Sequence, residues 1–149
     1  MVASSVETRY ISFLMYEDQE EIKTFTLSEA RSLIPRLRTL LARVIKERDI
    51  LALMNDELER ARERAELGGG THLGVAYLKH IASFSDAVHK VQELGVLIKD
   101  FRTGLIDFPY EYDGRIVYLC WKMDEDDIDW WHEIEAGFAG RQLLTEDFQ

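Results

Sequence analysis

The chain has 149 residues, of which 46% are hydrophobic and 31% are charged, and this composition is typical of one folded domain with a sizeable core. The formal net charge of −10 argues against a surface that follows nucleic-acid phosphates, and no apolar run reaches the length of a membrane span. A single cysteine excludes an intrachain disulfide, so nothing indicates an oxidising compartment and we expect a cytoplasmic protein. From the charge and the short apolar runs we expect no nucleic-acid or membrane partner.

The predicted organisation is an N-terminal extension over residues 1–22, followed by a single domain over residues 23–149. Within the domain, residues 23–95 are expected to form a helical hairpin and residues 96–149 a β-module. The first helix is predicted to begin after Thr26, because Thr26 and Glu29 have the spacing of a capping box. Apolar residues then recur at helical spacing, with the widest stripe at residues 33–44.

A glycine run at residues 68–70 predicts the end of the first helix, and a second helix is expected from about Thr71 to Leu94. The two helices are antiparallel, since a short turn joins them. The first is roughly 60 Å long and the second roughly 36 Å, so the second is expected to cover only the distal part of the first, near residues 51–65. The apolar stripe at residues 33–44 then has to be buried by the β-module.

The β-module is predicted from the Asp113-Gly114 pair, which is typical of a type I′ hairpin turn between two β-rich runs. A two-residue turn pairs Tyr112 with Arg115 and places most of the aromatic bulk on one face. Pro109 lacks an amide hydrogen, which favours an edge position for the first of these strands or pairing through its other side only. Residues 128–134 are expected to form a third strand, with a short helix as the alternative. The predicted fold class is therefore α+β: a long antiparallel helical hairpin with a small antiparallel β-meander packed on the first helix.

Several short motifs, taken together, resemble the bacterial domain-of-unknown-function 2203 family. They are TFTLSEA (24–30), IP (34–35), Gly95, KD (99–100), GLIDFP (104–109), DGR (113–115), LCW (119–121), Glu125, WH (131–132) and GFAGR (137–141). The chain departs from the family pattern at Asp124, where a glycine is usual, and after Arg141, where a proline usually follows soon and this chain has Gln142-Leu143-Leu144. The resemblance implies a small bacterial cytoplasmic protein and carries no activity with it.

The candidate site lies in the β-module. Asp107, Glu125 and His132 are candidate metal ligands, because carboxylate and imidazole groups suit zinc or iron, and Asp107 and Arg141 are candidate ligand-binding residues. Cys120 lies near Asp107 if the hairpin register holds. The structural alternative is that Asp107 hydrogen-bonds a loop, His132 bonds a backbone carbonyl, and Arg141 pairs with the acidic loop.

Two classes of function follow from these patterns. The first is a non-catalytic binding or self-assembly module that uses the hairpin, as a homo-oligomer or with a protein partner. The reason is that the distal part of the first helix has a heptad-like seam with Asn55 at a polar position. The second is a metal-binding or small-ligand-binding protein, with a divalent metal as cofactor and its site on the β-module. Whether the chain is an enzyme stays open at this point.

Overall fold

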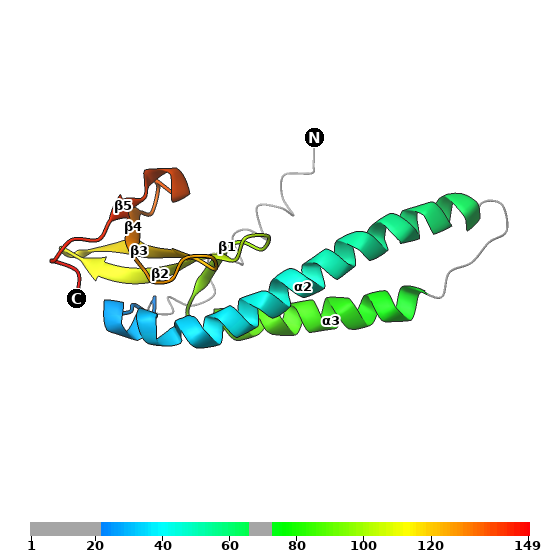
Figure 1. The fold of residues 1–149 in the computed structure, drawn as a ribbon, viewed down its shortest axis with the longest axis horizontal. Helices are drawn as coiled ribbons and strands as arrows, with labels where there is room; N and C mark the ends of the chain where they lie inside the picture. Colours follow the sequence, from blue (N-terminus) through cyan, green and yellow to red (C-terminus); the bar gives the residue numbers. More distant parts are fainter. Residues whose placement is uncertain (1–21, 66–72) are drawn as a thin grey trace, which may run out of the picture.

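The computed structural model describes residues 22–65 and 73–149. The elements are, in chain order, helices α2 (Leu27–Ala65) and α3 (Leu73–Gln92), strands β1 (Leu97–Asp100), β2 (Leu105–Tyr112), β3 (Arg115–Lys122) and β4 (Trp130–Glu133), the short 3₁₀ helix η1 (Phe138–Gly140) and strand β5 (Gln142–Leu143). Figure 1 shows the two long helices as a hairpin that projects beyond the sheet. The predicted N-terminal extension and the glycine run that was expected to end the first helix lie outside the described residues, except for Ile22.

The capping box predicted at the start of α2 is confirmed. The Glu29 amide donates to the Thr26 hydroxyl at 3.1 Å, and the Thr26 amide donates to the Glu29 carboxylate at 2.8 Å. Two backbone donors that have no partner inside the helix are thereby satisfied. None of the helices in the described ranges is both long and apolar enough to cross a bilayer.

The sheet is an antiparallel meander with the strand order β1-β2-β3-β4-β5. The predicted register between the central strands is confirmed, with Tyr112 opposite Arg115 and Ile106 opposite Trp121. Asp113 and Gly114 both have positive φ, at 49° and 73°, as a type I′ turn requires. The third predicted strand is present as β4, over a shorter range than the sequence indicates.

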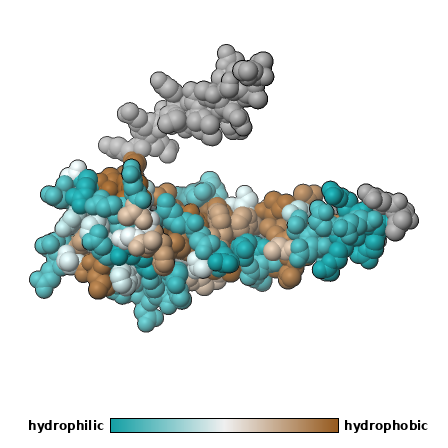
Figure 2. All heavy atoms as spheres, turned by 90° about the horizontal axis from the view of Figure 1, so that it is seen from above, coloured by the Kyte–Doolittle hydropathy of each residue, from teal (hydrophilic) through white to brown (hydrophobic). Residues whose placement is uncertain are grey.

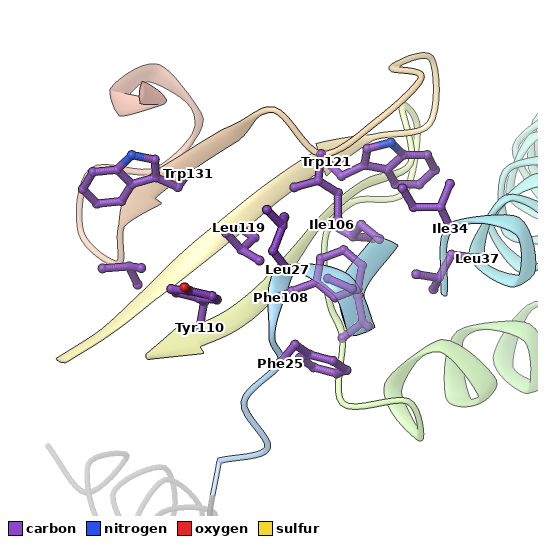
Figure 3. Close-up of a cluster of buried hydrophobic side chains, with 14 of the residues drawn as sticks. Phe25, Leu27, Ile34, Leu37, Ile106, Phe108, Tyr110, Leu119, Trp121 and Trp131 are labelled. Atoms are coloured by element: carbon purple, nitrogen blue, oxygen red, sulfur yellow. The ribbon is translucent and has the colours of Figure 1, made fainter. Parts of the chain in front are cut away.

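The hydrophobic core lies between one face of the sheet and the first half of α2, so the predicted α+β architecture is confirmed. Figure 3 shows side chains of β2, β3 and β4 gathered with those of α2 and the residues that precede it. The buried cluster includes Ile34, Leu37, Leu41, Phe108, Leu119 and Trp121. Two arginines of α2 bind the acidic loop after β3: Arg31 pairs with Asp127 at 2.9 Å, and Arg38 donates to the carbonyl of Glu125 at 2.6 Å.

The prediction that α3 covers α2 only near residues 51–65 is wrong. Arg43 of α2 pairs with Asp86 of α3 at 2.9 Å, and Glu47 contacts the His80 imidazole at 2.6 Å. The contact between the helices therefore reaches back to Arg43, and Val91 of α3 is part of the main core. The expected range was too short for the helix lengths themselves, because residues 51–65 span only about 22 Å, whereas α3, with 20 residues, spans about 30 Å and lies along half or more of α2.

Of the two alternatives for the first hairpin strand, the edge position is wrong, because β2 lies between β1 and β3. Pairing through one side only at Pro109 is confirmed, because Pro109 pairs with Tyr118 of β3. The strand tolerates Pro109 because β1 pairs with β2 only as far as Asp107. The carbonyl of Pro109 instead accepts a hydrogen bond from the Phe25 amide at 2.8 Å. A proline can thus occupy an inner strand at a position that needs no donor toward the short neighbour.

Candidate functional site

The face of the sheet that points away from α2 carries three buried residues with metal-ligand chemistry. Asp107 on β2 lies directly opposite Cys120 on β3. His132 on β4 lies opposite Tyr118, which places it diagonally beside Cys120. Because side chains alternate along a strand, these residues share the face opposite to Phe108, Leu119 and Trp131 of the core.

Asp107, Cys120 and His132 come close enough together to share one ion. One ligand atom from each lies within 4.8 Å of the other two, and each of the three residues is 1% exposed. The His132 Nε2 atom is 3.2 Å from Asp107 Oδ1. Two donors on one tetrahedral zinc are separated by roughly 3.5 Å, so each separation would have to shorten by about 1.3 Å at most to bring all three atoms onto one ion.

The hydrogen bond made by His132 Nδ1 determines which ring nitrogen carries the proton in the neutral imidazole, and therefore what Nε2 directs at Asp107. His132 Nδ1 is 2.8 Å from the Glu133 carbonyl oxygen. A carbonyl oxygen can only accept, so Nδ1 carries a proton and donates it. In the neutral ring, Nε2 then directs a lone pair at a carboxylate oxygen, and a proton or a metal ion has to lie between them. A backbone carbonyl that holds the far nitrogen is the usual arrangement around metal-bound histidine.

Burial controls the protonation of the other two groups. It raises the pKa of the Asp107 carboxyl, and the neighbouring His132 opposes this change only in part. Burial also raises the pKa of the Cys120 thiol from 9.0 to about 12, and the adjacent Asp107 carboxylate acts in the same direction. Burial therefore disfavours both the Asp107 carboxylate and the Cys120 thiolate unless a cation lies beside them.

Lys99 and Tyr118 border the cluster on the side of β1. The Lys99 ammonium lies 3.8 Å from Asp107 Oδ2, and among the described residues that oxygen has no hydrogen-bond partner. The same ammonium sits 5.2 Å from the centre of the Tyr118 ring, and that ring packs edge-on against His132. One oxygen of Asp107 therefore faces His132, and the other faces a surface lysine.

Glu125 and Arg141, which the sequence suggested as members of the site, form a separate pair. Arg141 Nη2 donates to both Glu125 oxygens, at 2.6 and 2.8 Å, and the guanidinium lies 5.0 Å from the Trp130 ring centre. Glu125 also accepts from the Lys122 amide at 2.8 Å. The structure thus places Asp107 and His132 together and Glu125 with Arg141. The third member of the cluster is Cys120, which the pairing of Asp107 with Cys120 in the sequence pattern already placed nearby.

The described structure defines an α+β protein with a projecting helical hairpin and a buried polar cluster on the outer face of a five-stranded meander. Residues 23–144 match the model of the uncharacterised conserved protein family DUF2203, so the chain belongs to that family. No curated protein matched the chain. No solved structure matched it either.

Proposed function

We propose that this protein binds a divalent transition metal through Asp107, Cys120 and His132. The observation that carries the proposal is the orientation of His132: its Nδ1 donates to the Glu133 carbonyl, while its Nε2 lies 3.2 Å from the Asp107 carboxylate. A proton or a metal ion has to be shared by these two atoms. The nearby Cys120 favours a metal over a proton, because a thiolate beside imidazole and carboxylate is the ligand set of zinc.

This proposal replaces Glu125 with Cys120 in the ligand set expected from the sequence. Glu125 is held by Arg141 and by the Lys122 amide, which leaves its oxygens engaged elsewhere. The Cys120 sulfur, in contrast, lies within 4.8 Å of a ligand atom of each of the other two residues. Burial of all three residues is compatible with the proposal, because a positive ion compensates the charge that burial otherwise penalises.

The test is metal analysis of protein purified without chelator, followed by titration of the stripped protein with Co²⁺ and Zn²⁺. We expect one equivalent of metal and a thiolate-to-Co²⁺ charge-transfer band. Cys120→Ser is expected to abolish that band, and His132→Ala to weaken binding by about tenfold or more. His89→Ala is the matched control, because His89 is exposed on α3 with Glu93 as its partner. The absence of bound metal across a panel of first-row divalent ions, with wild-type protein folded, would contradict the proposal.

We also propose a second function, self-association through the distal hairpin. The observation behind it is that no residue in the ranges 45–64 and 73–86 is buried. Figure 2 shows hydrophobic surface along the hairpin beyond the sheet, and the large exposed apolar side chains there are Leu53, Val75, Leu78 and Ile81. Two helices alone bury little, and a second copy of the hairpin would complete a four-helix core. Light scattering over rising concentration tests this, and a constant monomer mass would count against it.

A further inference from the structure

A cavity of about 530 Å³ lies beside the Asp107 cluster. Its lining includes the apolar or aromatic residues Ile22, Leu97, Pro109 and Tyr118 and the charged residues Lys23 and Glu93. Leu97 is the cross-strand partner of Asp107, and Pro109 is the partner of Tyr118. Pro109 and Leu97 are thus the neighbours of Asp107 along and across the outer face of the sheet. The volume lies within the range of small-molecule sites, roughly 300 to 1,000 Å³.

A positively charged side chain, Lys99, lies near both the cavity lining and the Asp107 cluster. Lys99 is on the same edge strand as Leu97, and its ammonium lies 3.8 Å from Asp107 Oδ2, the oxygen that His132 does not approach. The ammonium also lies 5.2 Å from the Tyr118 ring centre. Lys99, which does not itself line the cavity, is therefore close to the Tyr118 ring, which does.

The charge balance changes when a divalent metal is bound. Without the metal, the Lys99 ammonium balances the charge of ionised Asp107. With the metal, a carboxylate and a thiolate neutralise the ion, and the Lys99 charge is left without a counter-ion. Three protein ligands also leave a tetrahedral ion one free position, which is how catalytic and ligand-accepting zinc sites are built. The free position and the free ammonium together favour an anion.

We infer that the metal-loaded site binds a small carboxylic acid with an apolar chain, whose carboxylate bridges the metal and Lys99. The apolar chain lies in the cavity against Leu97, Pro109 and Tyr118. This inference rests on the proposed metal binding and adds the class of ligand. A carboxylate with a hydrocarbon chain fits better than a bare inorganic anion, because half of the eight lining residues, Ile22, Leu97, Pro109 and Tyr118, are apolar or aromatic and offer contacts that only a hydrocarbon chain can use.

The test uses pentanoate as the probe, with Zn²⁺-loaded protein followed by NMR. Metal stoichiometry is measured first on the same sample. Pentanoate is expected to shift the resonances of residues 97, 109 and 118, while 1-pentanol and acetate, which lack the charge or the chain, bind more weakly. Lys99→Met is expected to weaken pentanoate binding roughly fivefold or more while it retains the metal. Lys90→Met is the matched control, because Lys90 pairs with Asp86 on α3.

The outcomes separate the two proposals. If Zn²⁺ binds and pentanoate does not, or binds Lys99→Met as tightly as wild type, the inference fails and metal binding stands. Equal affinity for 1-pentanol and pentanoate overturns the inference as well, because it removes the role of the charge. If the folded wild-type protein binds no Zn²⁺, both the proposed function and the inference fail.

Discussion

Arg141 and Glu125 show how a pair of charged residues can stabilise the fold beside a candidate site without belonging to it. The Arg141 side chain is 10% exposed and its partner 21%, and the guanidinium lies between the rings of Trp130 and Phe138. The Glu125 carbonyl also accepts from the Trp121 indole at 3.1 Å. This pair therefore ties the acidic loop to the segment that follows η1.

At the residue scale we predict a strong coupling between Arg141 and Glu125. Arg141→Met and Glu125→Gln are each expected to destabilise the protein, and a double-mutant cycle in chemical denaturation should give a coupling of about 1 to 3 kcal/mol. The exposed pair Arg115 and Glu133, at 2.7 Å, is the matched control and should give a much smaller coupling. Metal stoichiometry should be unchanged in Glu125→Gln. Loss of the metal in that variant would restore Glu125 to the ligand set.

At the element scale, the start of α2 connects the helix to the rest of the fold. The Leu27 amide donates to the carbonyl of Gln149 at 3.0 Å, and Phe25 packs edge-on against Phe108 of β2. The capping box of Thr26 and Glu29 lies between these contacts. A correct helix start therefore also sets how the sheet sits on α2.

We predict that Thr26→Ala lowers the free energy of unfolding by about 1 kcal/mol, because an orphan amide loses its acceptor. Thr39→Ala, at an exposed position within the same helix, should be neutral or slightly stabilising, since alanine favours helix. Denaturant titration of the three proteins measures both effects. Equal destabilisation by the two substitutions would show that the cap contributes nothing specific.

The capping box should also respond to pH. The hydrogen bond from the Thr26 amide lowers the pKa of the Glu29 carboxyl below 4.5. Its contribution to stability is therefore complete above pH 4.5 and is lost as the pH falls through the lower folded value. The stability difference between wild type and Glu29→Ala should shrink over that range.

At the scale of the whole molecule, the chain divides its apolar residues between a closed core and an open hairpin. The core uses both the sheet and α2, whereas the distal hairpin exposes Val75 by 68% and Leu78 by 65%. A polar network crosses the hairpin at its base, where Ser83 donates to Glu47 at 3.0 Å and accepts from Arg43. This network fixes the position of α3 along α2. The apolar side chains of α3 named above stay exposed.

We predict that Val75→Ser combined with Leu78→Ser shifts the protein to a monomer while helicity measured by circular dichroism is retained. The reason is that these side chains contribute contact area in an assembly and bury nothing in the single chain. Leu143→Ser is the matched control, because Leu143 is 61% exposed on β5. An unchanged mass for the double variant, or an equal shift for the control, would argue against the hairpin as the contact surface.

The local features of this fold could be predicted from the sequence because they depend on adjacent residues. The capping box requires only Thr26 and Glu29, and the turn at Asp113 and Gly114 determines the pairing of β2 with β3. β1 and β5 were not predicted, since strands of 4 and 2 residues have too little alternation to detect. The overlap of the helices depends on side-chain pairs such as Arg43 and Asp86, which no local pattern reveals.

The candidate site was only partly predictable for the same reason. Asp107 and Cys120 are brought together by the hairpin register, which the sequence does indicate. The approach of His132 depends on how β4 pairs with β3, and the attachment of Glu125 to Arg141 depends on the path of the chain after η1. Both are long-range arrangements. Residue chemistry alone therefore selected Asp107 and His132, which lie together in the structure, and also Glu125, whose carboxylate pairs with Arg141.

The continuity of α2 has a mechanical consequence. One helix of 39 residues forms both the floor of the core and one arm of the hairpin, so no hinge separates the sheet from the arm. Such a helix is a rod of about 58 Å. If two copies associated through the ends of their hairpins, the length of α2 would set the distance between the two candidate sites. Inserting one whole turn into the arm would lengthen that distance by about 10.8 Å, because each of the two copies contributes about 5.4 Å.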